Sequence, residues 1–257
     1  MKLDLGCGTH KHPDFYGIDR RPHQDVDLVW DLNEGLPLPD ESVEWVMACR
    51  FLPYVHDLQA MLTEIYRVSI HKAIVCILVP YAHSFKHSTN PLLRHRFDEH
   101  TPRHFTNCFF QPSHGPVSPA LSPYENLDEL PYDFRLLRME YFYNESLRAA
   151  SYESEELEDL HRIQVNVVDE ILYHFVVIKE EVTPSELEQL SRHSHMEPHC
   201  AHELRSIPSP LDFSEEEPLL SDEGGIRRPK VLRRTFSPRH FPNKTPQLLT
   251  IRKRNPS

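Results

Sequence analysis

Short apolar segments alternate with polar ones over residues 1–80, and this pattern predicts buried strands. Each segment has the length of a strand and is rich in Val, Ile and Leu. The segments are Lys2–Leu5, Phe15–Ile18, Val26–Trp30, Val43–Ala48 and Ala73–Val79. The last one, AIVCILV, is apolar throughout and ends before Pro80, as expected for a central strand covered on both faces.

One amphipathic helix is predicted between the fourth and fifth of these strands. Asp57 is a suitable N-cap residue. Apolar residues follow it at helical spacing, namely Leu58, Met61, Leu62, Ile65 and Tyr66. A helix between two strands favours a right-handed βαβ crossover, and the alternation of strands with connecting segments favours an α/β sheet.

The second half of the chain is less regular. Residues 81–116 show no period and are expected to form long loops with one or two short helices. Two late strands are predicted at Phe134–Phe142 and Ile171–Lys179, with an acidic surface helix, ESEELEDLHRI, between them. A late strand pair commonly forms an antiparallel edge. The expected fold is therefore a Rossmann-like, mostly parallel α/β sheet with a C-terminal antiparallel edge hairpin.

The strand and helix pattern ends near Val182. Ten of the 23 prolines lie in residues 184–257, and charge is distributed unevenly. The net charge is −15 over residues 141–225 and +10 over residues 226–257, within a total of −11. These features predict a folded domain at 1–181 and a disordered tail at 182–257. Its basic end is a candidate site for RNA or an acidic partner.

The cysteines and histidines indicate a reducing cellular compartment and no metal site. The five cysteines are widely spaced without a CxxC, which favours free thiols and a reducing compartment. No signal-like segment precedes Met1, and no apolar run approaches the roughly 18 residues of a membrane span. We therefore expect a cytoplasmic protein without a membrane partner. The stretch HSHMEPHCAH at His193–His202 lacks a standard zinc spacing, so no metal site is predicted.

The glycine loop after the first strand carries the clearest chemical signal. Gly6 and Gly8 allow a tight turn that a ligand can approach closely, and Asp19 ends the next strand, where it can accept hydrogen bonds from ribose hydroxyls. Lys11 stands where a nicotinamide fingerprint needs its third glycine, and no GK[ST] follows. The pattern favours a nucleoside site of another kind.

At this point the sequence resembles a known family. The motifs that carry the resemblance are LDLGCG with GID, VDLVWDLNEGLPLPDESVEWV, and LTEIYRV before AIVCILVPY. Over about residues 1–180, the chain is similar to class I S-adenosylmethionine-dependent methyltransferases of the type 11 group. The resemblance implies S-adenosylmethionine as cofactor. It places Asp4, Gly6, Cys7 and Gly8 at the methionine end, Asp19 at the ribose, Asp31 and Leu32 at the adenine, and Cys49 and Arg50 beside the sulfonium and substrate. Cys7 is expected to pack rather than to act as a nucleophile.

The chain also departs from this family. Six residues, Thr9–Asp14, join the glycine loop to the second strand, so the usual first helix should be lost or reduced to a turn. Asn90-Pro91-Leu92-Leu93 replaces the Asp-Pro-Thr-His that relatives often carry. His87 or His95 is the substitute base that we expect, and Tyr81 should line the substrate pocket.

The methyl acceptor is expected to be a small molecule or a sugar hydroxyl. Two alternatives stay open. RFLPY at 50–54 and the lost His alter the usual polar groups, so the first alternative is a degenerate methyltransferase fold that serves binding or scaffolding. Alternatively, the basic tail recruits RNA to an RNA-directed methyltransferase.

Overall fold

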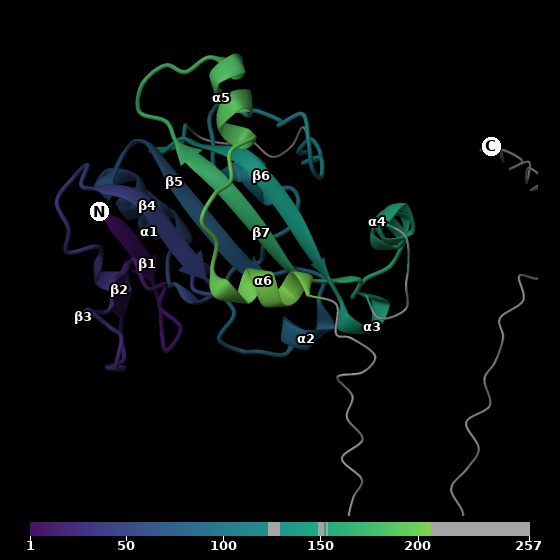
Figure 1. The fold of residues 1–257 in the computed structure, drawn as a ribbon, viewed down its shortest axis with the longest axis horizontal. Coiled ribbons are helices and arrows are strands. Elements are labelled where there is room, and N and C mark those ends of the chain that lie inside the picture. The colour runs from purple at the N-terminus through teal and green to yellow at the C-terminus, as the bar shows by residue number, and fades with distance from the viewer. Residues whose placement is uncertain (123–128, 149–151, 153, 207–257) are drawn as a thin grey trace, which may run out of the picture. The chain divides into compact units, whose positions relative to one another are not determined.

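The structure is a computed structural model that describes residues 1–122, 129–148, 152 and 154–206 (Figure 1). It contains a seven-stranded sheet with the order β3-β2-β1-β4-β5-β7-β6. The strands are β1 (Lys2–Leu5), β2 (Tyr16–Asp19), β3 (Leu28–Val29), β4 (Val43–Cys49), β5 (Ser69–Pro80), β6 (Phe134–Tyr143) and β7 (Val168–Val177). The first five strands pair in parallel, and β7 is antiparallel to both β5 and β6.

Helices cover both faces of this sheet. They are η1 (Leu32–Glu34), η2 (Leu52–Tyr54), α1 (Leu58–Val68), α2 (Phe85–Ser88), η3 (Thr101–His104), α3 (Glu145–Arg148), α4 (Ser154–Ile163), α5 (Pro184–Ser191) and α6 (His199–Arg205). α1 packs on one face, whereas α5 and α6 cross the other (Figure 1). Among the described residues, no helix has the length and apolar character that a bilayer crossing requires.

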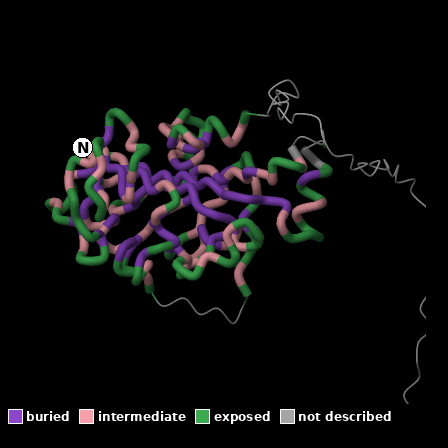
Figure 2. Tube along the Cα trace, turned by 90° about the horizontal axis from the view of Figure 1, so that it is seen from below, coloured by how far each residue is buried: buried purple, intermediate pink, exposed green. Residues whose placement is uncertain are grey.

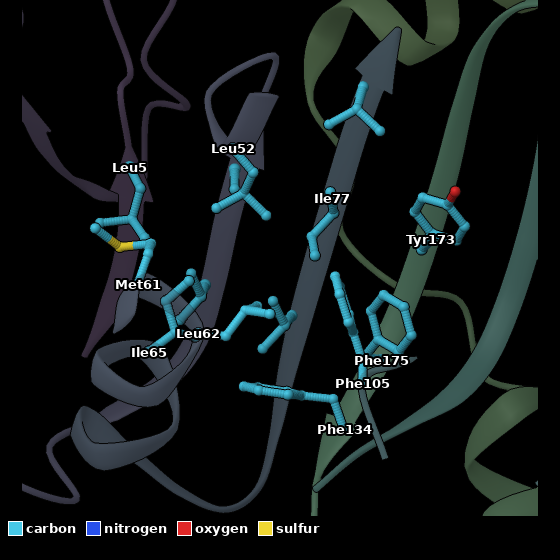
Figure 3. Close-up of a cluster of buried hydrophobic side chains, with 14 of the residues drawn as sticks. Leu5, Leu52, Met61, Leu62, Ile65, Ile77, Phe105, Phe134, Tyr173 and Phe175 are labelled. Atoms are coloured by element: carbon cyan, nitrogen blue, oxygen red, sulfur yellow. The ribbon is translucent and has the colours of Figure 1, made fainter. Parts of the chain in front are cut away.

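Strand β5 shows why the sheet is buried on both sides. Val75, Ile77 and Val79 join the core under α1, together with aromatic side chains from β6 and β7 (Figure 3). The alternate residues Cys76 and Leu78 face the opposite side, where they pack with residues of α6. Successive side chains of a strand point to opposite faces, so an unbroken apolar run fills two cores. Figure 2 shows buried strands between more exposed outer layers.

The predicted fold class is confirmed, and most predicted elements lie within a few residues of the observed ones. The Asp57 carboxylate accepts a hydrogen bond of 2.9 Å from the N–H of Ala60, as an N-cap does. β2 follows the glycine loop without an intervening helix, because residues 9–14 form turns and irregular backbone. The predicted parallel order ends in the expected antiparallel edge, β7-β6.

The boundary expected at residue 182 is not where regular structure ends. Thr183 caps α5 by accepting from the N–H of Glu186, Pro184 occupies the first turn, and Leu187 packs into the sheet face. α6 follows and buries Ala201. Low mean hydropathy hid these helices, because each contributes few apolar residues to a surface that the sheet already provides. Residues 207–257, including the basic segment 226–257, lie outside the described residues.

Candidate functional site

The carboxyl ends of the parallel strands bring the predicted site residues to one edge of the sheet. Gly6 follows β1, Asp19 ends β2, Arg50 follows β4, and Tyr81 follows β5. The strand order reverses direction at β1, between β2 and β4, which is where open α/β sheets bind ligands. The topology therefore assembles residues that are up to 75 positions apart in the sequence.

Asp19 and the glycine loop are joined directly. The backbone N–H of Gly8 donates to Oδ2 of Asp19 at 3.0 Å, and the N–H of Arg21 donates to Oδ1 at 2.9 Å. Each carboxylate oxygen accepts more than one hydrogen bond, so both oxygens keep capacity for the hydroxyls of a ribose. The Asp19 carboxylate is thus oriented before any ligand arrives.

The two glycines serve different purposes. Both have positive φ, +65° at Gly6 and +53° at Gly8. A Cβ on Gly6 would lie 2.6 Å from Cδ2 of Phe51, whereas a Cβ on Gly8 would meet nothing within 4 Å. Gly6 therefore permits both the turn and the close packing of Phe51, and Gly8 leaves open space beside the loop.

Two cavities meet at the glycine loop. The smaller, of about 190 Å³, is lined by Asp19, Trp30, Asp31, Leu32 and neighbouring residues. The larger, of about 590 Å³, is lined by Asp4, Cys7, Gly8, Cys49 and residues of the α6 segment, among others. Gly6 and Arg50 line both cavities. An elongated ligand with a nucleoside at one end and an amino acid at the other could occupy these two neighbouring spaces.

The smaller cavity has the character of an adenine site. Oδ1 of Asp31 accepts from the backbone and side-chain nitrogens of Asn33 at 3.0 and 2.8 Å, and these bonds lower the pKa of Asp31. Its other oxygen has no hydrogen bond recorded with the described residues and can accept from an amino group. Leu32 is buried in the core beneath, and Trp30 is held by a 2.9 Å bond from Nε1 to the Gly35 carbonyl.

Two polar residues of the larger cavity are strongly desolvated. Burial raises the pKa of Asp4 to about 6, although the N–H of His12 donates to its Oδ2 at 3.0 Å. Burial, followed by the nearby carboxylates of Asp4 and Asp19, raises the pKa of Cys7 to about 12. The Cys7 thiol therefore stays protonated at neutral pH and packs beside Gly17, in agreement with the expectation that it is not a nucleophile.

Arg50 spans the top of the sheet. Its φ is +54°, and its guanidinium makes two bonds with Glu170 at the start of β7, Nε to Oε1 at 2.6 Å and Nη2 to Oε2 at 2.7 Å. Glu170 is only 3% exposed. The hydrogen bonds and charge of Glu170 raise the pKa of Arg50 further above its usual value. The cavity wall at Arg50 is thereby fixed to a strand beyond β5.

The three predicted catalytic residues line one small cavity of about 50 Å³. In it, Nε2 of His87 is buried and has no partner among the described residues, and burial lowers the pKa of this imidazole. His95 instead donates from Nε2 to the Val55 carbonyl at 3.0 Å. Nδ2 of Asn90, in the same cavity, donates at 3.3 Å to the hydroxyl of Tyr54, and Tyr54 lines the smaller cavity at the glycine loop. Of the two histidines, His87 has the free nitrogen.

Tyr81 is held in a polar cluster rather than poised to lose its proton. Its hydroxyl donates to Oε2 of Glu99 at 2.5 Å and lies 3.2 Å from Nε2 of His161. Burial, together with the hydrogen bond to Glu99, raises the pKa of Tyr81 well above its usual value. Tyr81 can position a substrate, but its hydroxyl is unsuited to act as a base.

Several lining residues escaped the sequence analysis. Trp30, Phe51 and Tyr54 add aromatic surface to the smaller cavity. Their position just after β3 and β4 was the feature of the sequence that could have identified them. Glu170 was missed because its partner Arg50 is 120 residues away. His199, Cys200 and Glu203 were missed because the tail was expected to be disordered.

Comparison with known proteins gives structural likeness without sequence matches. No protein-family model matches the chain, and no curated protein matches it. A SAM-dependent methyltransferase from Archaeoglobus fulgidus is 17% identical, with 68% of this chain and 84% of that one covered and a TM-score of 0.42. One from Mesorhizobium loti is 14% identical, with 68% and 89% covered and a TM-score of 0.40. The [4+2]-cyclase SpnF is 15% identical, with 68% and 73% covered and a TM-score of 0.42.

The strand order defines the fold independently of these similarities. Five parallel strands run β3-β2-β1-β4-β5, and the antiparallel β7 lies between β5 and β6. This is the Rossmann-like sheet with an antiparallel edge that the pattern of the sequence predicts. The chain therefore has a Rossmann-like, mostly parallel α/β fold whose antiparallel edge is formed by β7 and β6.

Proposed function

We propose that this protein is an S-adenosylmethionine-dependent methyltransferase that acts on a small-molecule or sugar hydroxyl. The observation that carries the proposal is the pair of cavities that share Gly6 and Arg50, with the Asp19 carboxylate oriented on the glycine loop. Basic and acidic side chains line the larger cavity, where an ammonium and a carboxylate would be held.

Residues of both cavities fit the cofactor. Asp19 would accept hydrogen bonds from the ribose hydroxyls, while Asp31, Leu32 and Trp30 would surround the adenine. Asp4 and the Gly6–Gly8 loop would hold the ammonium and carboxylate of the methionine end. Cys49 and Arg50 would form the wall beside the reacting centre, although the guanidinium is committed to Glu170. When bound, the cofactor supplies the electrophilic methyl group and its own leaving group.

The protein's part in the reaction is alignment and removal of a proton. Nε2 of His87 would take the proton from the acceptor hydroxyl once the cavity around this buried nitrogen opens. The nitrogen has no partner among the described residues, and burial lowers its pKa, so the ring is neutral near pH 7. Tyr81 and His95 would shape the same cavity. η2 lies between the two regions, since the N–H of Arg94 donates to the Pro53 carbonyl at 2.8 Å.

Calorimetric titration of S-adenosylmethionine and S-adenosylhomocysteine into the full chain tests cofactor binding. We expect micromolar affinity for both, weakened at least tenfold by Asp19→Asn. Asp159→Asn is the matched control, because Asp159 is exposed on α4 and distant in sequence from the loop. A folded wild-type chain that binds neither compound would overturn the proposal and favour a scaffold protein.

Turnover is tested with a panel of hydroxyl-bearing small molecules and sugars, read out as release of S-adenosylhomocysteine. His87→Asn is expected to lower kcat by about 10²–10⁴ while leaving cofactor affinity within twofold. His193→Asn, at an exposed residue after α5, is the control. An unchanged kcat in His87→Asn would remove the role of base from this residue.

A further inference from the structure

Two thiols from distant parts of the chain meet on the wall of the larger cavity. Cys49 ends β4 and Cys200 lies on α6, 151 residues later, with their Sγ atoms 3.4 Å apart. Both are free cysteines. Both line the same cavity as Asp4 and Gly6. Methyl transfer as proposed above needs neither sulfur, so the pairing calls for another role.

The remaining cysteines differ from this pair. Cys7 and Cys76 are buried, and Cys108 is exposed. Of the five cysteines, all within the described residues, only Cys49 and Cys200 share a sulfur–sulfur hydrogen bond. Both are partly accessible. The pair therefore combines proximity with access.

The surroundings give the two sulfurs unequal roles. The hydrogen bond with Cys49 lowers the pKa of Cys200; burial opposes this shift, and the Arg50 guanidinium supports it. The same hydrogen bond, followed by burial, raises the pKa of Cys49. A thiolate is the attacking species in thiol–disulfide exchange. Cys200 is thus suited to attack first, and Cys49 to resolve the mixed disulfide.

We propose that Cys49 and Cys200 are a redox modification site, at which a small-molecule disulfide converts the two thiols into an intramolecular disulfide that weakens cofactor binding. Cys200 attacks the small-molecule disulfide and releases one thiol. Cys49 then gives up its proton and displaces the second thiol from Cys200. Two protein thiols are oxidised and one small-molecule disulfide is reduced to two thiols, so atoms and electrons balance.

α6 is built so that such a bond would alter the cavity. An S–S bond of about 2.05 Å is shorter than the present 3.4 Å separation, so the two walls must approach. Ion pairs hold α6 in place, because Arg205 pairs with Glu140 at 2.7 Å and, just before the first turn, with Glu197 at 2.5 Å. His199, near Cys200, is exposed and lines the cavity. Oxidation would draw the first turn of α6, which carries Cys200, towards β4 and into the space proposed for the methionine end.

Disulfide formation is tested on the full chain carrying Cys108→Ser, which removes the exposed cysteine outside the site. The protein is treated with oxidised glutathione, the remaining thiols are blocked, and peptides are mapped by mass spectrometry without reduction. We expect a peptide cross-linked between Cys49 and Cys200 and a loss of two free thiols, both reversed by dithiothreitol. Absence of that peptide, or only mixed disulfides with glutathione, would overturn the proposal.

The effect on the cavity rests on the proposed function and has its own measurement. S-adenosylhomocysteine is titrated into the reduced and oxidised Cys108→Ser chain, and we expect Kd to rise at least tenfold on oxidation. In Cys200→Ser/Cys108→Ser the Kd ratio between treated and untreated protein should stay near one. Equal affinity in both states of the Cys108→Ser chain would overturn the effect on binding. No affinity even in the reduced chain would instead overturn the proposed function, while the peptide map still decides the disulfide.

Discussion

Arg50 and Glu170 face each other across β5, and the two carboxylate oxygens of Glu170 accept from Nε and Nη2 at 2.6 and 2.7 Å. The pair is asymmetric in exposure, because the Glu170 side chain is 3% exposed and that of Arg50 is 45% exposed. The cost of breaking the pair should therefore depend on which partner is removed.

Removing the cation should be the more damaging change. Arg50→Met leaves a buried carboxylate without a counter-ion and is expected to lower the free energy of unfolding by about 3 kcal/mol. Glu170→Gln leaves a cation that can turn to water, so we expect a loss of about 1–2 kcal/mol. Urea unfolding at pH 7.5 measures both, with Arg162→Met in the exposed Arg162–Asp159 pair as a control near zero. Equal losses would show that Glu170 is not buried in this way.

Alanine at Gly6 should lower stability and cofactor affinity more than alanine at Gly8 does. In Gly6→Ala the new Cβ would lie 2.6–2.8 Å from atoms of Phe51, so the ring must move and the shared wall of the cavities changes. Gly8→Ala meets open space, and only the left-handed backbone costs about 1 kcal/mol. Thermal unfolding and cofactor titration should both be hit harder by Gly6→Ala. Partial rescue by Gly6→Ala/Phe51→Ala would identify the clash as the cause, whereas equal effects of the two alanines would refute it.

The raised pKa of Asp4 should make the folded chain less stable at neutral pH than at low pH. Its pKa is about 6 in the folded chain against 3.8 ordinarily, so the native state binds the proton more tightly. The protonated form therefore stabilises the fold at low pH, and this stability is lost as pH rises through about 6. The difference corresponds to about 3 kcal/mol.

Asp4→Asn should consequently raise the free energy of unfolding at pH 7.5 by about 1–3 kcal/mol and weaken cofactor binding at the same pH. The Asn side chain can still accept from the His12 N–H. Urea titrations from pH 4.5 to 8 would show a flatter pH dependence in the variant. A destabilised variant would mean that the Asp4 charge supports the fold after all.

The lowered pKa of His174, on the other face of the sheet, should give the stability of the fold the opposite pH dependence. Burial, followed by the positive character of His195, lowers its pKa to about 3, and its ring stacks on that of His195 at 5.2 Å between centroids. Arg138 and Glu140 also act on it. Because the unfolded chain binds this proton more tightly, the stability is full above pH 6.5 and is lost as pH falls towards 3.

His174→Leu should therefore remove part of the acid lability of the chain. We expect its midpoint of acid unfolding, followed by circular dichroism, to move down by about half a pH unit or more. Exposed His193→Leu should leave the midpoint unchanged. A midpoint that moves up would show that the imidazole contributes polar contacts, such as that of Nε2 with the Met196 carbonyl, which outweigh its cost.

The local pattern of the sequence was sufficient for the sheet but not for its edges. Strand β5 and the Asp57 cap of α1 are visible in the sequence because their signals lie within a few residues of each other. The Arg50–Glu170 and Cys49–Cys200 pairs are not, since only the fold brings residues 120 and 151 positions apart together. Motif spacing similarly found the glycine loop, whereas the cavity walls from α6 depend on tertiary packing.

α5 illustrates a signal that was present and underweighted. Thr183-Pro184-Ser185-Glu186 has the spacing of a capping box with proline in the first turn, and the Thr183 side chain does accept from the N–H of Glu186. Composition alone, averaged over 182–257, concealed this short motif. The distinction matters for where the folded part of the chain ends.

Truncation at residue 181 and at residue 206 should show which of the two is the end of the folded part of the chain. A protein ending at residue 206 keeps Leu187, Ala201 and Arg205, so its unfolding midpoint in urea should lie close to that of the full chain. A protein ending at residue 181 uncovers one face of β5 and β7 and loses the Arg205–Glu140 pair, and it should aggregate or lose several kcal/mol of stability. The shorter protein also lacks the α6 wall of the larger cavity, so any folded fraction should bind S-adenosylhomocysteine more weakly. Equal stability and affinity of the two truncated proteins would show that the sheet face needs no cover from α5 and α6.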